Sequence, residues 1–203
     1  MLIFALHGYN MTNSSVVSGF NFTSRSNGQA ITVYPQGLSN AWTSDSTDYT
    51  FMQTLITDLE SKYCIDTNRV YMTGFSQGGV FANDVACEKN SLFRAYAPVE
   101  GCGPGGLNAK LSPVCSVADA KPAIMVIVGD SDTTATPEQA QATRDFWIKR
   151  NGCSQTTTSS YTGCVTYSGC AEGKPVVYCH GAWNHTTSSN AATDVWSFFN
   201  DLK

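Results

Sequence analysis

The sequence has little charge, no cluster of basic residues and no long apolar run. Charged residues make up 14% of its 203 residues, and the 16 acidic and 12 basic side chains are scattered. A surface of this kind does not favour binding to nucleic acid or to an anionic membrane. No stretch approaches the ~20 apolar residues of a membrane-spanning helix. The apolar residues 1–6 are too few for a secretion signal, so we expect a buried strand there.

The eight cysteines contain no Cys-x-x-Cys pair, which is the spacing typical of zinc and redox sites. An even set of cysteines is stable in an oxidising medium as disulfides, so the chain is expected to be secreted. We expect local pairing for the first four cysteines, because short loops demand the least of the fold. The expected pairs are Cys64–Cys87, Cys102–Cys115, Cys153–Cys170 and Cys164–Cys179.

Short apolar runs alternate with helix-like stretches along the whole chain. Strands are expected near residues 2–6, 30–35, 69–72, 93–99, 123–128 and 175–179. Helices are expected within 12–27, 49–63, 80–89, 136–150 and 189–199. This alternation predicts an α/β fold with a mostly parallel, doubly wound sheet of about six strands. We see no linker, so residues 1–203 are expected to form a single domain.

A Gly-x-Ser-x-Gly motif lies between the strand near residues 69–72 and the helix that follows it. In Gly74-Phe75-Ser76-Gln77-Gly78 the glycines leave room for a sharp turn, which predicts a nucleophile elbow that exposes Ser76. Gly8, which follows the apolar residues 1–6 and His7, allows a second sharp turn just before Tyr9. The backbone N–H groups of Tyr9 and Gln77 are therefore candidates for an oxyanion hole.

A serine hydroxyl needs a base to take its proton and an acid to orient that base. Of the two histidines downstream, His180 directly follows a strand, whereas His185 lies in the middle of a loop and is the better candidate base. Asp130 and Asp132 both follow the strand near residues 123–128, and periodicity does not distinguish them. His7 precedes Ser76 in the chain and is interpreted as a structural histidine.

Two tryptophans are candidate substrate-binding residues. Trp42 lies in a polar loop and is either a core residue or one that faces substrate. Trp183 lies beside the candidate base, and packing is the alternative for it as well.

Several sequence blocks together resemble a known group of enzymes. They are Leu6-His7-Gly8, Tyr34-Pro35-Gln36-Gly37, Cys64-Ile65-Asp66-Thr67-Asn68-Arg69-Val70-Tyr71, Gly74-Phe75-Ser76-Gln77-Gly78-Gly79, Gly129-Asp130-Ser131-Asp132 and Trp183-Asn184-His185. The group is that of secreted carbohydrate esterases related to feruloyl esterases and polyhydroxybutyrate depolymerases.

The resemblance implies an α/β-hydrolase fold with Ser76 as nucleophile, Asp132 as acid and His185 as base, and without a metal or organic cofactor. It selects Asp132 over Asp130. Members of the group carry two further strands before the His-Gly block, so we expect a sheet that lacks them. The usual glycine-rich lead-in to the histidine is replaced here by Gly-Ala-Trp-Asn at residues 181–184.

The function expected from the resemblance is that of a monomeric serine esterase that releases hydroxycinnamate from plant cell-wall polysaccharide. The alternatives are an acetyl xylan esterase, a polyester depolymerase, or a non-catalytic carbohydrate-binding protein with the same fold. A non-catalytic protein would lack part of the triad, whereas here all the candidates are present. Asn10 and Asn184 are in N-glycosylation sequons. A glycan on Asn184 would crowd His185, so the active protein is expected to carry none there.

Overall fold

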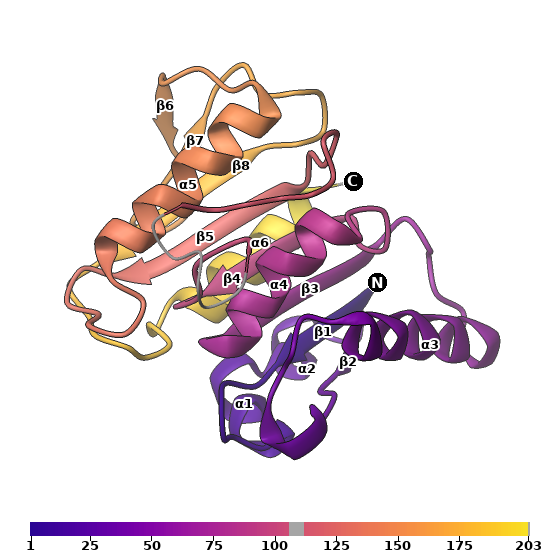
Figure 1. Ribbon diagram of the computed structural model, residues 1–203. Helices are drawn as coiled ribbons and strands as arrows, with labels where there is room; N and C mark the ends of the chain where they lie inside the picture. The colour runs from indigo at the N-terminus through magenta and orange to yellow at the C-terminus, as the bar shows by residue number, and fades with distance from the viewer. Residues whose placement is uncertain (106–111, 203) are drawn as a thin grey trace.

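The computed structural model describes residues 1–105 and 112–202 (Figure 1). Its strands are β1 (Leu2–Leu6), β2 (Ile31–Val33), β3 (Val70–Phe75), β4 (Ala95–Val99), β5 (Ala123–Gly129), β6 (Thr157–Ser159), β7 (Cys164–Tyr167) and β8 (Val176–Gly181). Its helices are α1 (Asn13–Phe20), α2 (Phe22–Arg25), the short 3₁₀ helix η1 (Leu38–Asn40), α3 (Ser46–Lys62), α4 (Gln77–Glu88), α5 (Pro137–Asn151) and α6 (Ala191–Asp201). None of these helices is both long enough and apolar enough to cross a membrane.

The strands form one sheet in the order β2-β1-β3-β4-β5-β8-β7-β6. Neighbouring strands from β2 to β8 are parallel, which confirms the predicted α/β class with about six parallel strands. The antiparallel strands β7 and β6 extend the sheet beyond that prediction. Sequence patterns missed β6 because its residues, Thr157–Ser159, are polar and exposed. In β7, Cys164 is paired in register with Cys179 of β8 and bonded to it.

Helices cover both faces of the sheet, as a doubly wound fold requires. Successive residues of a strand point to opposite faces. On β1, Phe4 belongs to a core shared with α3, α4 and α5, whereas Ile3 belongs to a core shared with α1, α2 and α6. Both side chains are completely buried. The continuous apolar runs of β1, β3, β4 and β5 are therefore strands covered on both sides, whereas the edge strand β2 is only partly buried.

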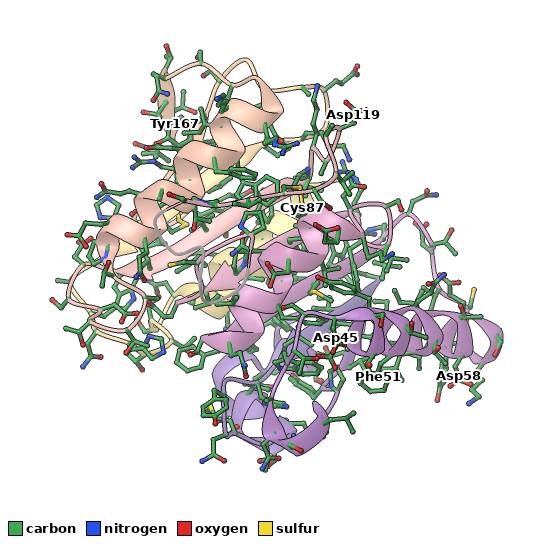
Figure 2. All side chains as sticks on the ribbon, viewed as in Figure 1. Asp45, Phe51, Asp58, Cys87, Asp119 and Tyr167 are labelled. Atoms are coloured by element: carbon green, nitrogen blue, oxygen red, sulfur yellow. A yellow bond between two sulfur atoms is a disulfide. The ribbon has the colours of Figure 1, made fainter. Side chains whose placement is uncertain are left out.

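Helix boundaries follow local capping chemistry. Asp45 accepts hydrogen bonds from the N–H groups of Thr47 and Asp48 and starts α3 (Figure 2). Thr136 and Gln139 form a capping box at the start of α5. The one helix expected within residues 12–27 is two helices, because Asn21 between them adopts a left-handed conformation with φ 30°.

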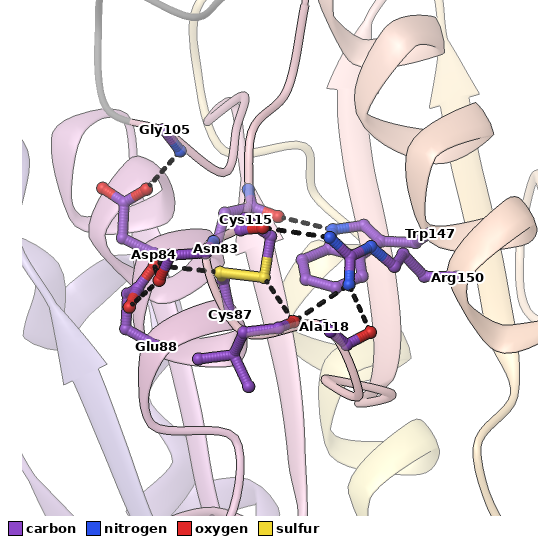
Figure 3. The surroundings of a disulfide bond; sticks show 11 residues. Asn83, Asp84, Cys87, Glu88, Gly105, Cys115, Ala118, Trp147 and Arg150 are labelled. Carbon is purple, nitrogen blue, oxygen red and sulfur yellow. Dashed lines mark hydrogen bonds between the residues drawn. A yellow bond between two sulfur atoms is a disulfide. The ribbon is translucent and has the colours of Figure 1, made fainter.

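Three disulfides lie within the described residues, and two of the four expected pairs are wrong. The bonds are Cys87–Cys115, Cys153–Cys170 and Cys164–Cys179. The last two are the pairs expected from the sequence. Because Cys87 is bonded to Cys115 (Figure 3), the expected pairs Cys64–Cys87 and Cys102–Cys115 do not form.

The position of residues 115–118 explains this correction. Arg150 of α5 donates hydrogen bonds to three backbone carbonyls of this segment and holds it across the C-terminal end of α4 (Figure 3). Cys115 thereby lies 5.5 Å from Cys87 between Cα atoms. Cys64 is exposed in the turn after α3 and is not in a disulfide. Sequence spacing favours the shortest loops and does not reveal which loop covers the end of a helix.

Candidate active site

Ser76 occupies the sharp turn between β3 and α4. Its backbone, with φ 53° and ψ −118°, lies in a sparsely populated region that costs about 1–3 kcal/mol. A Cβ on Gly74 would lie 2.4 Å from the backbone of Gly78, and one on Gly78 would lie 2.6 Å from the carbonyl oxygen of His7. Both positions therefore need glycine. The structure has the strand, turn and helix geometry that the motif predicts.

Ser76, His185 and Asp132 come from three different loops and form a continuous line of hydrogen bonds. His185 Nε2 lies 2.9 Å from Ser76 Oγ, and His185 Nδ1 lies 2.6 Å from Asp132 Oδ2. A carboxylate only accepts hydrogen bonds, so Nδ1 donates its proton to Asp132 and Nε2 is left to accept the serine O–H. The structure brings the three predicted residues together, and their catalytic roles stay a prediction.

Asp132 is buried in the turn after β5, and hydrogen bonds stabilise its charged form. Its Oδ1 accepts from the backbone N–H groups of Thr134, at 2.6 Å, and Ala135, at 2.9 Å. Burial acts to raise the pKa of Asp132. Hydrogen bonds with Glu100, His185 and these two N–H groups outweigh burial and hold that pKa below its ordinary value. Asp132 is therefore ionised at neutral pH.

The two backbone N–H groups predicted for the oxyanion hole lie beside Ser76. A Cβ on Gly8 would lie 3.2 Å from Ser76 Cβ, so the chain that leads into Tyr9 passes close to the serine. Gln77 is the first residue of α4. Within the described residues, neither Tyr9 N–H nor Gln77 N–H donates to a protein acceptor. Both groups are thus free to bind a ligand oxygen, and the oxyanion role stays a prediction.

Trp42 is a core residue, which corrects its interpretation as a substrate-binding residue. Its side chain is only 3% exposed and stacks on Phe81. Trp42 Nε1 donates to the carbonyl oxygen of His7 at 2.9 Å, and its backbone N–H donates to the side-chain oxygen of Gln77 at 3.2 Å. Trp42 therefore connects the loop after β1 to the first turn of α4.

Trp183 also fills a structural position rather than the substrate position expected for it. It is half-buried and does not line the cavity beside Ser76. Its Nε1 donates to Glu100 Oε1 at 2.6 Å, and its carbonyl oxygen accepts from Ser131 N–H at 3.0 Å. A Cβ on Gly129 would lie 2.2 Å from that carbonyl oxygen. Trp183 therefore fixes the turn that carries Asp132.

The other two histidines have different surroundings. His7 is fully buried, and its Nδ1 donates to the carbonyl oxygen of Gly8 while its Nε2 accepts from Gly37 N–H. This agrees with its interpretation as a structural histidine. The half-exposed His180 lies 2.9 Å, Nδ1 to Oδ1, from Asp130. His180 and Asp130, the alternative candidates for the base and the acid, therefore pair with each other and not with Ser76.

Glu100 is a residue of this site that sequence analysis missed. It directly follows β4, is 1% exposed, and has a left-handed backbone with φ 49°. Its Oε2 accepts from Gly129 N–H at 3.0 Å. Burial, followed by a hydrogen bond with Asp132, raises the pKa of Glu100 to about 8. Its position just past the end of a parallel strand, where functional residues gather in such sheets, is the sequence signal that could have identified it.

Glu100, Asp132 and His185 are also the types of ligand that bind divalent metals. One potential ligand atom of each lies within 4.8 Å of the others. Asp132 Oδ2 and His185 Nδ1 face each other, however, and His185 Nε2 faces the serine. The arrangement therefore fits a chain of hydrogen bonds better than a metal centre.

A cavity of about 200 Å³ with mostly apolar walls opens beside Ser76. It is lined by Tyr9, Ser76, Gln77, Val80, Glu100, Cys102, Thr134, Ala135, Gln139 and His185. Its walls come from the loops after β1, β3, β4, β5 and β8 and from the helices α4 and α5. An apolar group attached to a carbonyl carbon next to Ser76 Oγ would be accommodated there.

Comparisons with known proteins agree with this geometry. No family model matches the chain. Feruloyl esterase D of Neurospora crassa is 30% identical over 185 residues, which cover 84% of this chain and 61% of that protein. Probable feruloyl esterase C of Aspergillus niger is 29% identical over 225 residues, which cover 98% of this chain and 77% of that protein. The chain thus spans about three fifths to three quarters of the length of these relatives.

Solved structures identify the fold. The acetyl xylan esterase from Aspergillus awamori superposes with a TM-score of 0.77 at 18% identity, and the match covers 98% of this chain and 88% of that one. This likeness and the order of the parallel strands confirm the predicted fold. The curated relatives confirm the predicted resemblance to feruloyl esterases. The chain therefore has an α/β-hydrolase fold and is similar in sequence to feruloyl esterases.

Proposed function

We propose that the chain is a serine carboxylic-ester hydrolase that acts through an acyl-enzyme. The observation that carries this proposal is the hydrogen-bonded line from Ser76 through His185 to Asp132 at the wall of an apolar cavity. A buried, ionised acid, a correctly oriented imidazole and an accessible serine are what acyl transfer requires.

In this mechanism Ser76 Oγ attacks the ester carbonyl carbon while His185 Nε2 takes the hydroxyl proton. Asp132 stabilises the resulting imidazolium through Nδ1. The oxygen of the tetrahedral intermediate accepts hydrogen bonds from the N–H groups of Tyr9 and Gln77. His185 then donates the proton to the leaving alcohol. Water repeats the same steps to release the acid and free Ser76.

The proposed substrate is a feruloyl ester on a plant cell-wall polysaccharide. The relatives are named feruloyl esterases. The mostly apolar cavity suits the planar ring of a hydroxycinnamate, with the sugar left outside. The fold neighbour named as an acetyl xylan esterase makes an acetyl ester the first alternative, followed by an aliphatic polyester.

We further propose that the protein is secreted and acts as a single-domain monomer. Three disulfides among the described residues suit an oxidising compartment. Both hydrophobic cores share the one continuous sheet, which supports a single unit over residues 1–203. Size-exclusion chromatography with light scattering tests the oligomeric state.

The test of the function compares hydrolysis of methyl ferulate, acetylated xylan and an aliphatic polyester by the purified protein. We expect methyl ferulate to give the highest kcat/KM. Ser76→Ala should lower kcat by ~10⁴-fold or more and leave the circular dichroism spectrum unchanged. Undiminished turnover in the folded variant, or no hydrolysis of any ester by the unaltered protein, would disprove the proposal.

A further inference from the structure

We propose that Glu100 is a positioning residue that keeps a proton, donates it in a hydrogen bond to Asp132, and so holds Asp132 on His185. This inference rests on the proposed esterase function. It adds to the triad a second buried carboxyl group, which acts through Asp132.

The first support is the placement of the two carboxyl groups by neighbouring strands. Val99 at the end of β4 is in register with Ile127 of β5, and Glu100 N–H donates to the carbonyl oxygen of Ile127 at 2.9 Å. Glu100 and Asp132 thus lie just past the ends of adjacent parallel strands. They are 1% and 2% exposed, respectively. Two carboxyl groups this close and this buried cannot both carry a charge without a large energetic cost.

The hydrogen bonds around the pair show which group keeps the proton. Asp132 accepts from two backbone N–H groups on Oδ1 and from His185 on Oδ2. Glu100 accepts from Trp183 Nε1 and from Gly129 N–H. Asp132 therefore has three donors, one of them an imidazole that becomes cationic during the reaction, whereas Glu100 has two. The charge is more stable on Asp132, and the proton stays on Glu100.

The electrostatics of the pair agree with this assignment. Burial raises the pKa of Glu100 to about 8, while hydrogen bonds hold the pKa of Asp132 below its ordinary value. The titratable groups that face Glu100 are Asp132 after β5 and His185 after β8, and the Cys102 side chain lines the same cavity. From α4, Gly79 and Val80 contribute uncharged backbone next to Gly101.

The backbone of Glu100 is a further observation. A left-handed conformation is unfavourable for a residue with a side chain, and such conformations cluster at functional sites. The conformation coincides here with a carboxyl group directed at Trp183 and Gly129. A residue with only a packing role would not need these two hydrogen bonds.

The assignment predicts a loss of activity in alkaline solution. When Glu100 ionises, Asp132 loses a donor and gains a neighbouring negative charge. The two carboxylates then repel each other, and Asp132 no longer holds the imidazole at its position for Ser76. The rate of acylation should therefore fall as the pH rises through the pKa of Glu100.

The test measures kcat and KM for methyl ferulate from pH 6 to 10. Glu100→Gln keeps the shape and the donor but cannot ionise, so we expect kcat within about threefold of the unaltered protein at pH 7 and no decline near pH 8. Glu100→Ala removes the donor and should lower kcat about tenfold at pH 7 with little change in KM. Glu172→Gln removes the charge of an exposed glutamate and should leave the profile unchanged.

A further variant should move the alkaline decline to higher pH without abolishing it. Trp183→Phe removes an N–H that stabilises the ionised form of Glu100. The pKa of Glu100 should then rise, and the decline in activity should move to higher pH. A residue with a merely structural role would produce neither the loss of the decline nor this shift.

The inference is overturned if Glu100→Gln and the unaltered protein have the same profile from pH 7 to 10, or if Glu100→Ala keeps full kcat. Two readouts separate this outcome from failure of the proposed function. The rate at which a fluorophosphonate labels Ser76 should show the same alkaline decline without any natural substrate. The ¹³C NMR signal of the Glu100 carboxyl should titrate near pH 8, and titration near pH 4 would refute the inference whatever ester is hydrolysed.

Discussion

Two histidine–aspartate pairs lie at the C-terminal ends of β5 and β8, and their surroundings give them different properties. His180 belongs to β8, whereas the other three residues are in the loops that follow the two strands. The side chains of His180 and Asp130 are 51% and 47% exposed, so water screens their contact and the contact contributes little to stability. The Asp132 side chain is fully buried, and His185 has Ser76 on its second ring nitrogen. Burial and the third partner are the reasons for assigning to the second pair the proposed proton transfer from Ser76 to the leaving alcohol.

Replacing either histidine with alanine tests this distinction. His185→Ala should lower kcat as severely as Ser76→Ala, by ~10⁴-fold or more, because the two residues act as one unit. His180→Ala should change kcat less than about threefold, since it removes only an exposed pair. The measurement is steady-state kinetics on methyl ferulate. Loss of activity in His180→Ala alone would reverse the assignment.

The raised pKa of Glu100 also predicts how the free energy of unfolding depends on pH. In the folded protein it keeps its proton up to about pH 8, whereas an unfolded glutamate loses its proton near pH ~4.3. Between these values the folded state holds one more proton than the unfolded state, so raising the pH favours unfolding. The contribution is about 1.4 kcal/mol per pH unit, present in full below the unfolded pKa and lost up to the folded pKa.

Glu100→Gln removes this contribution. Urea unfolding at pH 5.5, 6.5 and 7.5 should show a free energy of unfolding that falls less steeply with pH in the variant than in the unaltered protein. Titrating groups that do not contact Glu100 affect both proteins alike and cancel in the comparison. Equal slopes in the two proteins would mean that Glu100 is ionised in the folded state at these pH values.

At the scale of secondary structure, the sequence predicted the elements whose chemistry is local. Apolar runs identified the parallel strands, because a strand buried on both faces needs apolar residues at every position. The glycines at 74 and 78 identified the elbow, because no other residue fits there. The β6–β7 hairpin was missed because β6 is polar and exposed, and the partner of Cys87 was missed because it depends on how a loop 28 residues away packs on α4.

The same limit applies to single side chains of the site. Ser76 and His185 follow from chain order and strand ends, whereas Asp132 was selected over Asp130 only by the resemblance to the feruloyl esterase group. Trp42 and Trp183 were misassigned, because aromatic composition does not show whether an indole N–H already has an acceptor inside the protein.

The corrected disulfide predicts different effects for two cysteine substitutions. Cys87→Ala opens a bond that spans 28 residues and should lower the free energy of unfolding by about 3–4 kcal/mol. Cys64→Ala should have an effect below about 0.5 kcal/mol, since Cys64 is exposed and outside any disulfide. Urea unfolding measures both effects. Equal losses in the two variants would restore the pairing expected from the sequence.

At the scale of the whole molecule, the loops of the candidate site gather at the end of the sheet where the parallel strands finish. Tyr9, Ser76, Glu100, Asp132 and His185 each follow a different strand. This edge is therefore where a bulky modification would matter most. The exposed Asn184 lies next to His185, within a sequon and in a turn closed by a hydrogen bond from Thr186 N–H to its carbonyl oxygen.

The active protein should carry no glycan on Asn184, since a sugar there would obstruct the approach of a polysaccharide to Ser76. Intact-mass measurement and peptide mapping of protein from a glycosylating host test this. Any fraction modified at Asn184 should be less active on the polymer than Asn184→Gln from the same host. A fully active fraction with sugar on Asn184 would contradict the expectation.

The two ends of the described chain lie together at the opposite end of the sheet, where the strands begin (Figure 1). Leu2 N–H donates to the carbonyl oxygen of Arg69, and Tyr71 Oη donates to the carbonyl oxygen of Leu202. A bead, a surface linker or a carbohydrate-binding module joined at either end would therefore sit behind the mouth of the cavity. Immobilised in this way, the protein would present the mouth of its cavity to the surrounding solution, and either terminus would serve as the point of attachment.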